Sequence, residues 1–129
     1  MKMIHQLLPY AFYIILIIVI VRAFFKKINN PKKDKLVLIT LILAHTQLVL
    51  GLIMLIPFLQ AGIEMSNSAN RFITVEHPVT MLIGVILITV GKLKAKKIED
   101  IAKANKTIFS YYFIALVVFA LRTPWDKIF

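Results

Sequence analysis

Four apolar runs, separated by short polar segments, constrain the fold of this chain more than any other feature. We expect these runs to form membrane-spanning helices over residues 7–25, 36–58, 72–91 and 107–125. A helix needs about 20 apolar residues to cross a ~30 Å hydrocarbon core. The last run is the shortest, because its apolar part covers residues 108–121, and it needs flanking residues on both sides. The sequence therefore predicts an all-α, integral membrane four-helix bundle that forms a single domain over residues 1–129.

The composition agrees with a membrane protein and excludes several other classes. Of the 129 residues, 60% are apolar, which leaves too little polar surface to cover a soluble globule of this size. The chain has no cysteine, so disulfides, thiolate metal sites and covalently attached c-type haem are excluded. The formal net charge of +10 is compatible with nucleic-acid binding. The basic residues, however, lie between the apolar runs without interleaved aromatic side chains, so we interpret them as a topology signal and predict no nucleic-acid partner.

The distribution of lysine and arginine predicts how the helices are oriented, because these residues are enriched in cytoplasmic loops. The two polar segments that follow the first and third spans hold most of the 16 basic residues. They are Arg22, Lys26, Lys27, Lys32, Lys33 and Lys35 in the first segment and Lys92, Lys94, Lys96, Lys97, Lys103 and Lys106 in the second. We therefore expect both termini and the polar segment at 60–70 to lie on the non-cytoplasmic side of the membrane.

The three histidines of the chain, His5, His45 and His77, lie in or beside the first three spans. A histidine in a helix often only hydrogen-bonds a carbonyl or reaches the interface. Three together also suit a metal or haem site, because imidazole is a common ligand of iron and bundles build such sites from facing helices. At ~1.5 Å per residue, their heights above the lysine-rich side are roughly 30, 12 and 22 Å, respectively. His5 and His45 are then too far apart to share an iron, and His77 belongs to both remaining pairs.

The surroundings of His77 allow two interpretations. Gly84 and Gly91 share a helical face with His77, and they remove side-chain bulk where either a neighbouring helix or a flat macrocycle can approach. Glu76 suits the role of a hydrogen-bond acceptor that orients a ligand histidine. Because adjacent helical residues point about 100° apart, Glu76 equally suits another helix's histidine, a proton path or the headgroup region. We therefore take His77 and Gly84 as candidate cofactor-binding residues and leave the role of Glu76 open.

Several segments resemble those of a known family, the small four-span membrane proteins of Gram-negative bacteria that are labelled cytochrome b or cytochrome b-like. The segments are His5-Gln6-Leu7-Leu8, Ala44-His45-Thr46-Gln47-Leu48 followed by Gly51-Leu52, Arg71-Phe72 followed by Val75-Glu76-His77, the run 86–91, and Pro124-Trp125. The resemblance covers most of the chain. It implies a multi-pass protein of the bacterial inner membrane, a b-type cytochrome with a histidine-ligated haem.

Two departures from the family pattern bear on the number of haems. Pro9-Tyr10 stand where an Arg-Trp pair is expected, which removes a basic residue that would contact a propionate near His5. Ala104 stands where relatives often carry a histidine, which removes a possible fourth ligand. One haem is therefore the most that this chain is expected to hold.

Taken together, these observations predict one haem b between the second and third spans. His45 and His77 are the expected axial ligands of its iron, with His5 as the substitute for His45, and Gly84 lies on the same face. An iron with two imidazole ligands passes one electron at a time, so we expect a quinone or a redox membrane subunit as the partner, besides the lipid bilayer. The alternatives are a non-catalytic structural or assembly subunit without a cofactor, and a small transporter gated by Glu76 and His77. The sequence leaves open whether the protein is an enzyme and what its oligomeric state is.

Overall fold

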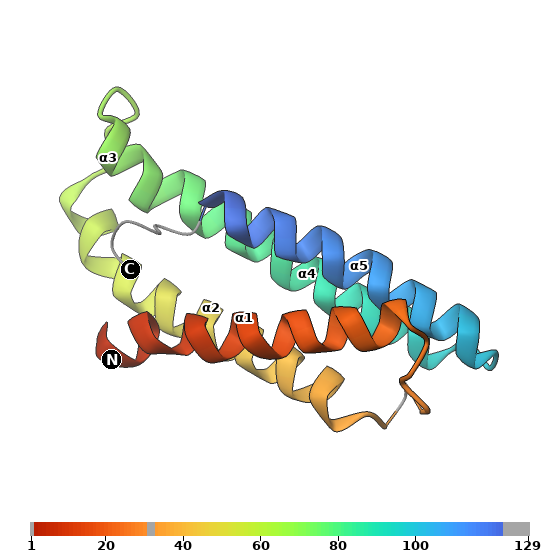
Figure 1. The fold of residues 1–129 in the computed structure, drawn as a ribbon. Coiled ribbons are helices and arrows are strands. Elements are labelled where there is room, and N and C mark those ends of the chain that lie inside the picture. The colour runs from red at the N-terminus through yellow and green to blue at the C-terminus, as the bar shows by residue number, and fades with distance from the viewer. Residues whose placement is uncertain (1, 31–32, 123–129) are drawn as a thin grey trace.

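The computed structural model describes residues 2–30 and 33–122, and in this part of the chain every regular element is a helix (Figure 1). The elements are α1 (Lys2–Phe24), α2 (Lys35–Ala61), α3 (Ser68–Arg71), the π helix η1 (Phe72–Glu76), α4 (His77–Lys96) and α5 (Ile101–Arg122). Because α3, η1 and α4 follow one another without a break, they form one rod over 68–96.

The helices form two antiparallel pairs that pack into a bundle (Figure 1). α4 packs against α5, α1 packs against both α2 and α5, and α2 packs against α4. The described parts of the first loop, 25–30 and 33–34, and the turn at 97–100 lie at one end of the bundle, which we call the lysine end. The start of α1 and the segment α3–η1 lie at the opposite end, which we call the His77 end. α1 and α4 therefore run in the same direction, from the His77 end to the lysine end.

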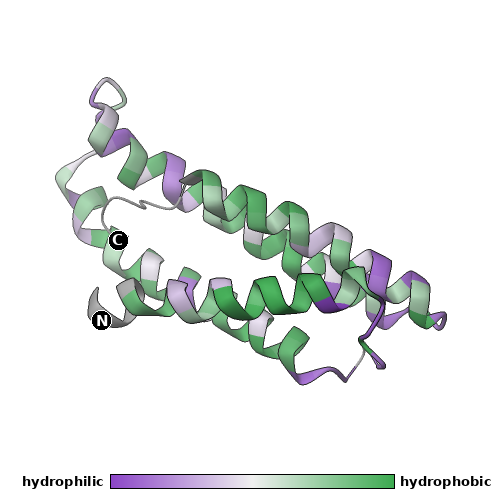
Figure 2. Cartoon of the chain, viewed as in Figure 1, coloured by the Kyte–Doolittle hydropathy of each residue, from purple (hydrophilic) through white to green (hydrophobic). Residues whose placement is uncertain are grey.

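The four long helical rods have the length and the surface that a membrane requires. The segments long and apolar enough to span are Leu7–Phe24, Lys35–Ala61, Ser68–Lys96 and Ile101–Leu121. Apolar residues cover their length, and hydrophilic residues gather at the ends of the bundle (Figure 2). Large aliphatic side chains such as Ile14, Ile42 and Val49 are about half exposed, a surface that suits lipid and not water. The prediction of an all-α four-span membrane fold is confirmed at this level.

The basic segment at 92–106 is divided between two helices. The sequence predicts that it continues the third helix into water or along the headgroups, whereas α4 ends at Lys96 and α5 begins at Ile101. Asp100 explains the break, because its carboxylate accepts a hydrogen bond from the Ala102 N–H at 2.9 Å and starts α5 as a cap. The fourth helix thus begins earlier than the predicted residue 107, and the predicted part beyond 122 lies outside the described residues.

Among the side chains described at 7–30 and 33–121, the hydrophobic core cluster lies mainly in the half of the bundle near the lysine end. Its outermost layer is formed by Phe12 and Phe119, whose rings meet edge to face at 5.2 Å between centroids, and by Gly84, against which the Phe119 ring packs. From this layer toward the lysine end the buried core includes Leu16, Val19, Ile20, Ala23, Ile28, Val37, Val85, Ile88, Ala95, Ala104, Ile108, Tyr112 and Ala115. We call the contact of Phe12, Phe119 and Gly84 the Phe119 layer.

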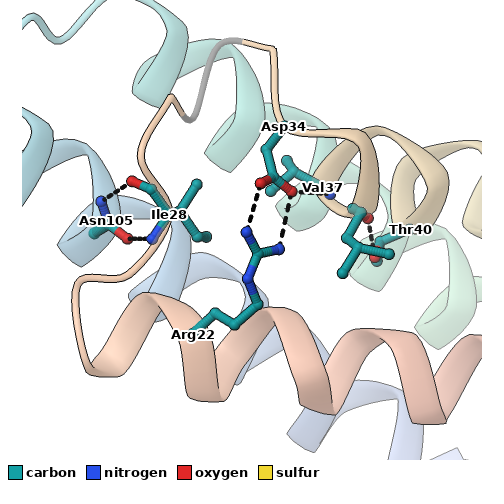
Figure 3. Close-up of polar contacts among 7 residues, drawn as sticks. Arg22, Ile28, Asp34, Val37, Thr40 and Asn105 are labelled. Atoms are coloured by element: carbon teal, nitrogen blue, oxygen red, sulfur yellow. Dashed lines mark hydrogen bonds and ion pairs between the residues drawn. The ribbon is translucent and has the colours of Figure 1, made fainter.

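Two polar clusters close the lysine end of the bundle (Figure 3). Asn105 of α5 accepts a hydrogen bond from the Ile28 N–H at 3.1 Å and donates one to the Ile28 carbonyl at 2.9 Å. Arg22 of α1 forms a two-pronged pair with Asp34, with N–O distances of 3.2 and 2.8 Å. Asp34 also caps α2 by accepting from the Val37 N–H at 3.1 Å. The loop at 25–34 is therefore fastened to α1, α2 and α5.

The ionisation of Asp34 reflects these contacts. Partial burial by itself raises the pKa of the Asp34 carboxyl, but the hydrogen bonds from Arg22 and Val37 and the charge of Arg22 hold that pKa below its ordinary value. The carboxylate is consequently charged at neutral pH, as a charge-assisted pair with arginine requires.

Candidate functional site

His77 directly follows the π helix, and Pro78 accounts for this local geometry. Proline has no N–H, so Pro78 cannot bond the carbonyl four residues earlier, and its ring crowds that carbonyl. The helix adapts by a wider turn, in which the His77 N–H donates to the Phe72 carbonyl five residues back. Turns of this kind occur frequently at functional sites.

The π turn brings together two pairs of side chains that are five residues apart. In an α-helix the facing neighbours are three or four residues apart. Here Arg71 Nε donates to Glu76 Oε2 at 2.9 Å, and the Phe72 and His77 rings lie 5.6 Å apart between centroids, tilted by 32°. Glu76 is thus engaged by an arginine, and the imidazole of His77 lies against an aromatic ring.

The polar segment before α3 is ordered by side chains of the same region. The Asn70 amide oxygen accepts from the Glu64 N–H at 2.7 Å, and its nitrogen donates to the Gly62 carbonyl at 3.4 Å. Arg71 donates to the Met65 carbonyl at 3.0 Å, in addition to its pair with Glu76. These bonds fix the connection between α2 and α3 against the turn that presents His77.

His45 lies on an exposed part of α2 and contacts α4. Its Nδ1 lies 2.8 Å from the Leu41 carbonyl, one helical turn earlier, so Nδ1 carries a proton and donates to this oxygen. Its Nε2 lies 3.5 Å from Oγ1 of Thr89, whose hydroxyl donates to the Val85 carbonyl at 2.8 Å. One of the two ring nitrogens of His45 is therefore used in an ordinary intrahelical bond.

The structure does not bring His45 and His77 together. Thr89, the α4 residue beside His45, follows His77 by twelve residues, which corresponds to about 18 Å along the helix axis. Two imidazole nitrogens bound to one metal ion lie about 4 Å apart, because each metal–nitrogen bond is ~2 Å long. In this arrangement the two histidines cannot ligate the same iron.

Residue counts along α1 and α4, by contrast, put the backbone of His5 near the height of His77. The Phe119 layer provides the reference, because the Phe119 ring contacts Phe12 of α1 and packs against Gly84 of α4. His5 precedes Phe12 by seven residues, and His77 precedes Gly84 by seven residues. Since α1 and α4 run in the same direction, seven residues at ~1.5 Å each correspond to about 10 Å from the Phe119 layer for both histidines, toward the His77 end.

The two glycines on the face of His77 serve the packing of α4 against α5. A Cβ atom on Gly84 would lie 2.5 Å from Cε1 of Phe119, and one on Gly91 would lie 2.5 Å from Cβ of Tyr111. Of the two interpretations of this face, the structure supports the close approach of a neighbouring helix, which is α5. The space beside Gly84 is filled by an aromatic ring of the chain itself.

The polar contacts of Asn105 and the pairing of Arg71 with Glu76 are features that sequence reasoning missed. Asn105 stands in a lysine-rich segment where it looks like one more solvated residue, and no local pattern marks it as buried. Pro78 directly after His77 was a usable signal for the π turn, because a proline within a helical run perturbs the preceding turn.

No protein-family model, no curated protein sequence and no solved structure matches this chain.

Proposed function

We propose that this chain is a membrane b-type cytochrome-like protein that transfers single electrons through one haem b at the His77 end, with His77 and His5 as the axial ligands. The observation that carries the proposal is that each of these two residues precedes the Phe119 layer by seven positions, on helices α1 and α4 that run in the same direction. A bis-histidine site in a bundle needs two imidazoles at one level on helices that face each other across its interior. His5 replaces His45 in this role, because His45 lies about 18 Å from His77 along α4.

The packing of the bundle supports the choice of this end. Beyond the Phe119 layer, toward the His77 end, the side chains described at 7–30 and 33–121 contribute only Leu55 and Thr74 to the buried interior. The remaining described core residues lie in the layer or on its other side. Among the side chains that the structure describes, the His77 end therefore has fewer buried apolar contacts than the lysine end.

The residues around His77 would hold its imidazole in a fixed orientation. Phe72 covers one side of the ring, and the π turn sets the direction in which the ring leaves α4. Arg71 and Glu76 place a compact ion pair, rather than an unpaired charge, beside the site. A bound haem would supply one-electron chemistry, and two imidazole ligands would leave no iron position for oxygen.

The orientation and location of the protein are part of the proposal. Both lysine-rich segments lie at one end of the bundle, so this end faces the cytoplasm if the chain follows the usual distribution of positive charge. The His77 end then faces the other side of a bacterial inner membrane, where a quinone or a redox subunit would exchange electrons with the haem.

An absorption spectrum of the purified protein in detergent tests the proposal. We expect a Soret band that sharpens and shifts when dithionite is added. His77→Ala and His5→Ala should each abolish this band, whereas His45→Ala, the matched control, should retain it. If His45→Ala loses the band and His5→Ala keeps it, the ligand assignment is wrong although a haem is present.

A non-catalytic structural or assembly subunit is the second candidate. It is favoured by the Phe119 ring that fills the space beside Gly84 and by the intrahelical bond of His45 to Leu41. A colourless protein that contains no iron after expression with excess haem precursor would support this candidate and reject the cytochrome.

A further inference from the structure

The two lysine-rich segments of the chain meet at the lysine end and form one surface. The bonds between Asn105 and Ile28 place the first loop, with Lys26 and Lys27, beside the start of α5, with Lys103 and Lys106. The packing of α4 against α5 adds the lysines that end α4. The bonded residues Ile28 and Asn105 are 77 positions apart, so lysines from distant parts of the chain contribute to the same cationic surface.

This surface carries a large excess of positive charge. All described lysines of the two segments are exposed, except for the half-buried Lys92. The acidic residues at this end are Asp34, which is paired with Arg22, and Glu99 and Asp100 in the turn between α4 and α5. Within the described part of the chain, none of these lysines forms an ion pair with a carboxylate. The lysine end therefore presents ammonium groups that are available to external anions.

Exposed apolar side chains lie next to these ammonium groups. Phe24 and Phe25 are 59% and 61% exposed beside Lys26, and Leu93 is 52% exposed beside Lys94. Lys94 Nζ donates to the Tyr111 hydroxyl at 2.7 Å, a contact in which the ammonium remains beside an aromatic ring. Cations that alternate with apolar groups match the boundary where phosphate headgroups meet acyl chains, and tyrosine is enriched at such boundaries.

We propose that the lysine end binds the phosphodiester headgroups of anionic phospholipids in the adjoining leaflet. The proposal does not depend on the histidines or on a haem. A soluble acidic protein or a nucleic acid would match the charge but not the exposed phenylalanines and leucine, which need acyl chains as neighbours. The fold makes the site, because the contact of Asn105 with Ile28 joins the two groups of lysines.

Native mass spectrometry of the full chain in detergent provides the test. The probes are phosphatidylglycerol and phosphatidylcholine with identical acyl chains, together with glycerol phosphate as the headgroup alone. We expect at least tenfold tighter binding of phosphatidylglycerol than of phosphatidylcholine, with weakening at high salt. Equal binding of the two lipids, or equal binding of glycerol phosphate and phosphatidylglycerol, would overturn the proposal.

Matched variants locate the site. A variant with Lys96→Gln, Lys97→Gln, Lys103→Gln and Lys106→Gln removes four charges, and its control has arginine at the same four positions. Each lysine near a charged membrane surface contributes about fivefold in affinity, so we expect the glutamine variant to lose at least tenfold and the arginine variant to retain binding. If both variants bind phosphatidylglycerol as the parent does, the lipid does not bind at the lysine end. If the glutamine variant does not fold, the salt dependence of phosphatidylglycerol binding by the parent protein tests the proposal instead. Binding that does not weaken at high salt would overturn it.

Discussion

Replacing Asn105 with alanine would remove the contact that joins the first loop to α5. The Asn105 side chain is fully buried and makes both hydrogen bonds of the Ile28 backbone, at 3.1 Å to its N–H and 2.9 Å to its carbonyl. It also donates to the Ile101 carbonyl at 2.8 Å. Ile28 is itself 0% exposed, so the variant leaves a buried donor and a buried acceptor without these partners.

The magnitude follows from these two groups. An unsatisfied buried polar group costs about 1–3 kcal/mol, so two of them give a range of roughly 2–6 kcal/mol. Water reaching the end of the bundle reduces this value, and the Ile101 carbonyl keeps its place in the helical hydrogen-bond pattern. We therefore expect Asn105→Ala to lower the free energy of unfolding by about 2–4 kcal/mol. Asn105→Leu should do the same, because it restores volume without restoring either bond.

Unfolding by sodium dodecyl sulfate in mixed micelles, followed by far-UV circular dichroism, measures this difference. Ser110→Ala on the same helix is the matched control. It removes an exposed hydroxyl that donates to the Lys106 carbonyl at 2.9 Å, and it should change stability by less than about 0.5 kcal/mol. If Asn105→Ala behaves like this control, the bonds to Ile28 do not hold the loop. If Asn105→Leu is as stable as the parent, lost volume rather than lost hydrogen bonding is responsible.

Two further predictions use the same assay. Gly91→Ala should destabilise the bundle by about 1–3 kcal/mol, because its new methyl would meet Cβ of Tyr111, which is fixed to the backbone of α5. Gly84→Ala should have the smaller effect, since the Phe119 atoms it meets are at the far end of a ring that can shift; equal effects would contradict this reasoning. The lowered pKa of Asp34 stabilises the folded state above the ordinary value of 3.8, and this contribution is lost as pH falls below that value. The stability advantage of the parent over Asp34→Asn should therefore be present at pH 6 and decrease as the pH falls below 3.8, and an advantage that grows as the pH falls would contradict the assignment.

Much of the fold could be predicted from the sequence because the membrane restricts the choices. Apolar runs of this length have few alternatives to spanning helices, and the polar segments mark where the chain turns between them. The boundary before α5 was missed, because the helical period of the basic segment continues through Asp100 and hides its capping role. The π turn was missed because periodicity analysis assumes one helical geometry throughout.

The candidate site was only partly predictable. Histidine content identified the three residues that matter for the haem proposal, but estimated heights could not choose between the two pairs that include His77. The contact of His45 with Thr89 disfavours the pair of His45 and His77, since it places His45 far from His77 along α4. Helix tilt and crossing, which fix these heights, depend on how side chains of different helices pack.

The sequence by itself determined that this chain forms four apolar helices with two lysine-rich connections. Apolar residues favour lipid and charged residues favour water, whichever residues they contact in the fold. Only the tertiary structure decided which distant groups meet. Burial of Asn105 against Ile28 joins the lysine groups into one surface, and the packing of Phe119 between Phe12 and Gly84 joins α1, α4 and α5 in one layer. Both outcomes depend on contacts between segments far apart in the chain, and such contacts leave no periodic signal in either segment.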